Sequence, residues 1–187
     1  MYFEIGWHHI ISWNALDHLL FIIALGAIYL VPNWKQVLLL ITAFTIGHSL
    51  TLALSVYDVV RFNVKWVEFL IPCTIIATAI INFSVKKFRY STLSYQYLLA
   101  LFFGLVHGMG FANTIRFMLS IDEDIALPLI SFNVGLEAGQ LLVVALLLLL
   151  SFLVVNKLTL PQKWWIRGWS AIAILPAIKM VVERWPL

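Results

Sequence analysis

Charged side chains are scarce in this chain. Lysine, arginine, aspartate and glutamate make up 11% of its 187 residues, whereas hydrophobic residues make up 63%. Soluble domains carry about 25% charged residues, interleaved with apolar ones so that helices and strands keep a polar face. Here the apolar residues fall in long blocks instead, each near the roughly 20 residues that a helix needs to cross about 30 Å of hydrocarbon. The composition excludes an ordinary soluble domain and predicts a helical integral membrane protein.

Cysteine is limited to Cys73, which lies within an apolar block and has no second cysteine with which to pair. Metal sites built from several thiolates are therefore disfavoured. The basic residues are spread over short loops and form no patch, so we expect no nucleic-acid partner. The first residues lack a positive leader with a small-residue cleavage site, so we expect no removable signal peptide.

The apolar blocks predict an all-α bundle of six transmembrane helices that forms one membrane domain over residues 1–187. The segment 2–13 is too short to span a bilayer. Because it contains Trp7 and Trp13, we expect it to form an interfacial helix or a lid at the lipid headgroups. The predicted spans cover about 15–31, 36–57, 65–85, 95–119, 126–155 and 164–184.

The charge of the loops predicts the orientation, because the side richer in lysine and arginine normally faces the cytoplasm. The first, third and fifth loops form the richer side, whereas the acidic cluster at 122–124 belongs to the other side. We therefore expect a multi-pass protein of the inner (cytoplasmic) membrane with both termini outside. The basic residues on the predicted cytoplasmic side are Lys35, Lys86, Lys87, Arg89, Lys157, Lys163 and Arg167.

Ionisable side chains occur inside the predicted spans, where each costs about 2.5–3.5 kcal/mol on insertion scales. They are Asp17 and His18 near the outer end of the first span, His48 in the second, His107 in the fourth and Glu137 in the fifth. Counted along the helices, the last three lie roughly 13–18 Å below the outer boundary, so they share a predicted level beneath the first two. The pattern predicts a buried site that is reached from outside.

Small residues at four-residue spacing lie beside these positions and let helix backbones approach closely in lipid. They are Ala43 and Gly47, Gly104 and Gly108, and Gly135 and Gly139. We therefore expect the helices to bring their short ionisable side chains to one point. Polar neighbours that could orient the site residues are Ser49, Asn133 and Gln140.

Imidazole and carboxylate donors suit divalent transition metals such as zinc, copper, nickel and iron, and a bound cation would offset the cost of burying carboxylates. Metal binding is therefore the favoured function of these residues. Structural roles are the alternatives. Asp17 could cap the first helix, and His48 and His107 could hydrogen-bond across helices. His8 and His9 could be surface residues at the interface.

Four segments, in order along the chain, carry a resemblance to a known family: "DHLLF", "TIGHSLTLAL", "GLVHGMGFA" and "FNVGLEAGQ". Together they resemble the HupE/UreJ family over nearly the whole chain. The resemblance implies a small membrane protein associated with hydrogenase and urease accessory functions, and hence with the maturation system of those enzymes. Proteins of this family are usually described as nickel or cobalt permeases.

The family motifs transfer only in part. In the first motif, five residues separate a histidine from an Asp-His pair. Here seven residues separate His9 from the pair at 17–18, so residues 11–13 must loop if His9 is to bind metal. The second motif runs Phe-His-Gly, two residues, His-Gly, one residue, Glu. Here Phe103 replaces its first histidine and Gly110 its glutamate, and Glu137 is a candidate for the missing carboxylate.

The sequence thus predicts a metal-ion permease, for nickel or cobalt by resemblance. The alternative is an intramembrane enzyme of the zinc type that acts on a lipid or membrane-anchored substrate, with a spare carboxylate as general base. A scaffold or assembly factor without a metal is the third reading. The predicted metal ligands are His9, Asp17, His18, His48, His107 and Glu137.

Overall fold

The computed structural model describes residues 1–12, 15–85, 93–118 and 125–186 and, between 93 and 118, the side chains of 95–111. All regular secondary structure in these ranges is helical, which confirms the predicted all-α class. The elements are α1 (Tyr2–Ile11), α2 (Leu16–Gly26), the 3-10 turn η2 (Val31–Asn33), α3 (Trp34–Val56), α4 (Val64–Ser84), α5 (Leu93–Met118), α6 (Ala126–Ser151), its π-helical extension η4 (Phe152–Lys157) and α7 (Gln162–Glu183).

Four helical segments in the described ranges are long and apolar enough to cross a membrane: Val31–Val56, Val64–Ser84, Ala126–Lys157 and Gln162–Glu183. Helices α1 and α2 qualify as a fifth span if they are taken together as one span bent by 66°. The predicted count of six stays a prediction. The predicted loop charges at 86–89 and 122–124 lie outside the described residues.

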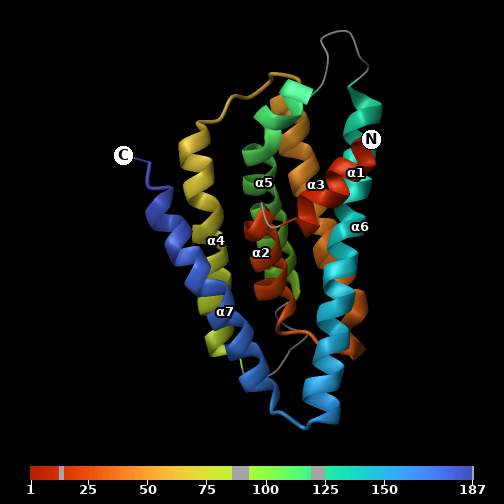
Figure 1. Cartoon of the computed structure of the whole chain (residues 1–187), viewed down its shortest axis with the longest axis vertical. Coiled ribbons are helices and arrows are strands. Elements are labelled where there is room, and N and C mark those ends of the chain that lie inside the picture. Colours follow the sequence, from red (N-terminus) through yellow and green to blue (C-terminus); the bar gives the residue numbers. More distant parts are fainter. Residues whose placement is uncertain (13–14, 86–92, 119–124, 187) are drawn as a thin grey trace.

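The helix observed in the first predicted span, 15–31, is shorter than that span. Helix α2 ends at Gly26 and contains 11 residues, which cover only about 16 Å along its axis. The chain then passes through Tyr29 into η2, whose Pro32 lies in the first turn, before α3 begins. In Figure 1, α2 lies at mid-height within the bundle rather than reaching from one end to the other. Its first residues, including Asp17 and His18, therefore start inside the protein.

The helices pack in three main pairs around α2. Helix α3 packs on α5 through the centre, α1 crosses α6, and α4 packs on α7 on the other side of the bundle (Figure 1). The N- and C-terminal ends both lie at the end of the bundle where α3 connects to α4. This arrangement leaves the first residues of α2 between α3, α5 and α7.

Glycines allow the closest of these approaches. A Cβ atom at Gly104 would collide with the backbone carbonyl of Phe44, and one at Gly108 would collide with that of His48, so α3 and α5 touch through their backbones. Likewise, Gly135 of α6 lies directly against the backbone of Phe3 in α1. The small-residue pairs thus act at two different interfaces, one of which involves the N-terminal helix.

Helix α1 forms within the segment that was expected at the headgroups. It ends at Ile11, and the backbone of the next residue, Ser12, is extended. Gly6 and Ile10 are buried against the bundle. The C-terminal end of α1 therefore lies close to the start of α2, whereas the placement of this segment at the headgroups stays a prediction.

Candidate metal centre

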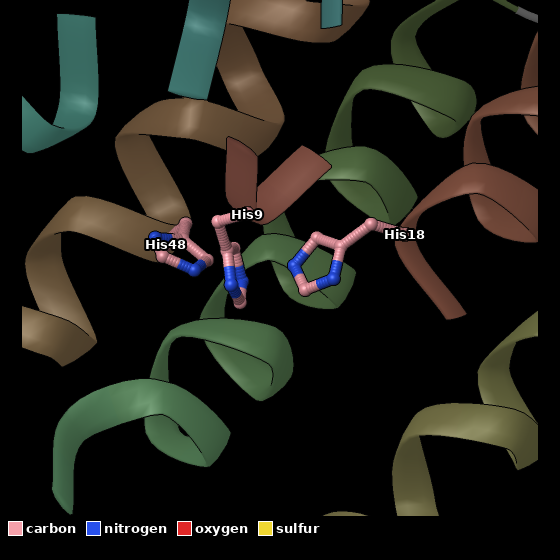
Figure 2. A group of neighbouring side chains, drawn as sticks. All are labelled: His9, His18 and His48. Atoms are coloured by element: carbon pink, nitrogen blue, oxygen red, sulfur yellow. The ribbon is translucent and has the colours of Figure 1, made fainter. Parts of the chain in front are cut away.

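Histidines from three helices meet inside the bundle. His9 of α1, His18 of α2 and His48 of α3 each offer one ring nitrogen, and these three atoms all lie within 4.8 Å of one another. Figure 2 shows the ring of His9 between the rings of His48 and His18. Nitrogen ligands of one tetrahedral zinc ion lie about 3.3 Å apart, so only a small closing movement separates this cluster from a ligand set.

A fourth histidine adjoins the cluster from α5. The ring centroid of His107 lies 4.8 Å from that of His18, and its side chain is buried. Its Nδ1 lies 2.8 Å from the carbonyl oxygen of Phe103, which can only accept, so Nδ1 donates and Nε2 is left as a lone-pair donor for a metal. Three helices therefore bring together the ligand group of His9, His18 and His48, and a fourth helix places His107 against the ring of His18.

The hydrogen bonding of these histidines is incomplete. Within the described part of the chain, Nε2 of His9, His18 and His107 and both ring nitrogens of His48 are buried without a hydrogen-bond partner. Buried polar atoms are nearly always paired, because an unpaired one loses its hydration without compensation. Several unpaired imidazole nitrogens at one point therefore fit a ligand that accepts lone pairs. A divalent transition metal ion is such a ligand.

Asp17 fixes the orientation of His18. Its Oδ1 accepts hydrogen bonds from the backbone N–H of His18, at 2.9 Å, and from the ring Nδ1, at 3.1 Å. Metal-binding histidines commonly donate their second ring N–H to a carboxylate in this manner, which fixes the tautomer and makes the free nitrogen a better ligand. The other oxygen, Oδ2, lies 3.3 Å from Nη1 of Arg184, which follows α7. In this geometry Asp17 therefore supports the metal site through the ring of His18 and is not itself one of the ligands.

Phenylalanines form a layer beneath the histidines. Phe21, Phe44 and Phe103 lie three or four residues from His18, His48 and His107 on the same helices, on the side away from the chain termini. The ring centroids of Phe21 and Phe44 are 5.1 Å apart, and those of Phe21 and Phe103 are 5.2 Å apart. All three side chains are buried. The layer separates the histidines from the lower half of the bundle.

A small cavity of about 10 Å³ lies beyond this layer. It is lined mainly by apolar side chains of α2 and α3, with Gln140 of α6 as its polar member. Such a volume is about that of one water position. Phe111 and Phe132 cover another side of the cluster, since the Phe111 ring centroid lies 4.0 Å from that of His9. The histidines are therefore held in dry surroundings.

A comparison with known families identifies the family of this chain. The family described as HupE / UreJ protein matches the chain over residues 1–187. The chain belongs to the HupE/UreJ family. No curated protein and no solved structure matches it. Membership of the family suggests a membrane role related to metals, as an accessory protein or a permease, with a link to hydrogenase and urease maturation.

Glu137 lies apart from the histidines of this HupE/UreJ protein. Its Oε1 accepts a hydrogen bond of 2.9 Å from Thr42, which stands six residues, or about 9 Å, from His48 along α3. The reason is the rotation of α6. Gly135 and Gly139 face α1. Glu137 lies two residues from each of them, which is about 200° around the helix, so its side chain points to nearly the opposite side. The structure therefore brings His9, and not Glu137, to the cluster.

The expected orienting residues have other partners. Ser49 donates to the carbonyl of Thr45 in its own helix, and Gln140 accepts a hydrogen bond of 2.9 Å from the Thr45 hydroxyl. Asn133 lies beside His48, but no hydrogen bond of normal length joins the two side chains. Asn133 Nδ2 donates instead to the carbonyl of Leu129. Of these residues, Asn133 is therefore the one that touches the histidine cluster.

Two features of the site were not predicted from the sequence. The phenylalanine layer has a sequence signal, because each of three histidines has a phenylalanine one helical turn away on the same side. Arg184 has none, because it lies beyond α7 and far along the chain from Asp17. Its contact depends on how α7 packs beside α2.

Proposed function

We propose that this HupE/UreJ protein is a permease for a divalent transition metal ion, with nickel or cobalt as the substrate by family resemblance. One observation carries the proposal: His9, His18 and His48 of three helices bring ring nitrogens within 4.8 Å of one another at a buried point, and His107 of a fourth helix adjoins them with an unpaired nitrogen. Neutral imidazoles can replace part of the hydration shell of such an ion. If no metal ion bound there, these buried nitrogens would have lost their hydration without a replacement, at a considerable cost in folding free energy.

The location of the cluster suits access from the end that carries the chain termini. His48 is eight residues from the end of α3 at Val56, or about 12 Å below that end of the bundle. Asp17 is 13% exposed, so its carboxylate lies at the edge of the site rather than in its centre. We infer that an ion reaches the histidines past Asp17 and leaves through the phenylalanine layer, which must open to let it pass. A dry aromatic constriction of this kind can gate permeation.

Uptake by reconstituted protein tests the proposal. Proteoliposomes that contain the wild-type chain should accumulate Ni²⁺ or Co²⁺, and His48→Ala and His107→Ala should reduce the initial rate at least tenfold, since each substitution removes a ligand. Glu137→Gln and His8→Ala should retain most of the rate, because neither side chain meets the cluster. Uptake that persists in both histidine variants would contradict the permease.

The intramembrane enzyme makes a different prediction for the same preparation. An enzyme would copurify with one tightly held ion, typically zinc, and would show no uptake, whereas a permease binds its substrate reversibly. Elemental analysis of purified protein, run beside His48→Ala, separates the two. One retained zinc ion per wild-type chain, lost in the variant and combined with absent uptake, would favour the enzyme.

A further inference from the structure

Arg184 contacts the metal centre through Asp17. Its Nη1 lies 3.3 Å from Asp17 Oδ2, while Oδ1 of the same carboxylate holds the ring of His18. The side chain of Arg184 is 29% exposed and that of Asp17 is 13% exposed, so water screens their interaction only in part. One carboxylate is thus shared between a permanent cation and the ring that carries an unpaired nitrogen.

The charged side chains of α7, the helix that precedes Arg184, are directed elsewhere. Lys163 Nζ and Arg167 Cζ each lie 5.7 Å from the centroid of the Trp164 ring. Lys179 pairs with Glu183 at 3.5 Å on the surface of the helix, and both side chains are largely exposed. Arg184 is therefore the cation that the described part of the chain places in contact with the site. A fixed positive charge beside a binding site for cations repels the ion and so lowers the affinity. Such a charge is useful only where a lower affinity is needed, or where it holds another group in place.

We propose that Arg184 is a positioning residue that keeps Asp17 behind His18 and thereby weakens the hold of the site on a divalent cation. The proposal rests on the metal-binding function proposed above and concerns the regulation of that same site. With Arg184 present, Asp17 Oδ2 is engaged and the carboxylate acts only through the histidine ring. Without Arg184, that oxygen is free to bind the ion directly, and an opposing charge has gone.

A limited affinity has a use in a permease. The ion must bind well enough to enter the site but weakly enough to leave it during each cycle. The imidazoles of this cluster together with a free carboxylate would make a tight site in dry surroundings, where charge interactions are strong. Arg184 removes the carboxylate from that set, so the ion can dissociate.

Binding measurements on the purified full chain test this role. We expect Arg184→Gln to bind Ni²⁺ on the order of tenfold more tightly than wild type in calorimetry. Arg184→Lys, which keeps the charge, should stay within about threefold of wild type. The matched control is Arg61→Gln. It removes the same charge from the Arg61–Asp58 pair, which lies at 2.6 Å on the surface between α3 and α4.

Transport kinetics supply a second readout. In proteoliposomes, Arg184→Gln should lower both the KM for Ni²⁺ and the maximal rate of uptake, because tighter binding slows release. A purely structural role for Arg184 would instead loosen the site and raise KM. A double substitution tests whether Arg184 acts through Asp17. Asp17→Asn should bind Ni²⁺ more weakly than wild type. Adding Arg184→Gln to Asp17→Asn should raise the affinity by less than it does in the wild-type background, because the carboxylate that Arg184 holds is absent.

The outcomes separate the two proposals. If the wild-type chain binds Ni²⁺ and His48→Ala does not, the metal site holds. An unchanged or weaker affinity in Arg184→Gln then overturns the role of Arg184 alone. A gain from Arg184→Gln that is as large in the Asp17→Asn background as in wild type overturns its action through Asp17. If the wild-type chain binds neither Ni²⁺ nor Co²⁺ nor Zn²⁺, the proposed function fails and the role of Arg184 fails with it.

Discussion

His8 and His9 are neighbours in the sequence with opposite surroundings. His8 is exposed, whereas the ring of His9 packs between aromatic rings and lies within reach of His18 and His48. The difference arises because successive residues of a helix point about 100° apart, and α1 packs on α6 along one side only. The pair therefore offers a matched comparison at the level of single residues.

We expect His9→Ala to weaken Ni²⁺ binding by about 10–100-fold, since it removes a ring nitrogen from the cluster, and His8→Ala to leave binding unchanged. Calorimetry on the two purified variants measures the effect. Equal affinities for His9→Ala and wild type would show that α1 contributes no ligand to the metal site.

Metal binding should also depend on pH. Imidazole binds a metal ion only when it is neutral, so protons compete with the metal at every ligand of the cluster. Affinity for Ni²⁺ should therefore fall on acidification, since each histidine that takes up a proton is lost as a ligand. Binding titrations over a series of decreasing pH values check the sign. An affinity that stays constant or rises on acidification would contradict ligation by histidine.

Sequence reasoning located three of the four histidines for a physical reason. His18, His48 and His107 lie within apolar blocks, where an ionisable side chain is costly and therefore conspicuous. His9 was identified by family resemblance instead, because it lies outside any block long enough to span. Glu137 was equally conspicuous, but its direction depends on how α6 is rotated against α1, and composition does not determine that rotation.

At the level of helices, glycine contacts hold the histidines in register. Gly104 and Gly108 bring α5 against the backbone of α3 and so place His107 near His48. A larger residue at either position must push the two helices apart. Displacement of this kind affects stability and the metal site together.

We expect Gly104→Ala to lower the free energy of unfolding by roughly 1–3 kcal/mol, the usual cost of overpacking. Gly168→Ala is the control, because an added methyl group at Gly168 meets nothing within 4 Å and alanine favours a helix. Thermal melting in detergent compares the two. A melting temperature for Gly104→Ala equal to that of wild type would show that the α3–α5 contact tolerates separation.

Hydropathy predicted most helices well because length and apolar content directly reflect the bilayer. Helices α3, α4 and α7 lie within two residues of their predicted spans at each end. The bend between α1 and α2 was not predictable in the same way. Eleven residues of α2 and ten of α1 are each too short to span. Packing against other helices gives them their places, α1 on α6 and α2 on α4 and α7.

At the level of the whole molecule, the ends of the helices define two sides. Val59, between α3 and α4, belongs to the side that carries both termini, and Leu158, between η4 and α7, belongs to the other (Figure 1). Both side chains are exposed. The positive-inside rule assigns the first side to the exterior.

A membrane-impermeant maleimide should therefore label Val59→Cys in intact cells and Leu158→Cys only after permeabilisation, each in a Cys73→Ala background. The chain has no other cysteine to react. The reverse pattern would invert the orientation. Labelling of both positions in intact cells would contradict a bundle that spans the membrane.

The contact between Asp17 and Arg184 also constrains biogenesis. The two residues are 167 positions apart, so the ribosome makes the carboxylate roughly 8–33 s before its counterion, at about 5–20 residues per second. During that interval the nascent chain carries an acidic group into the translocon without the arginine that later pairs with it. The segment that follows α7 thus neutralises a charge of α2 long after α2 has been made.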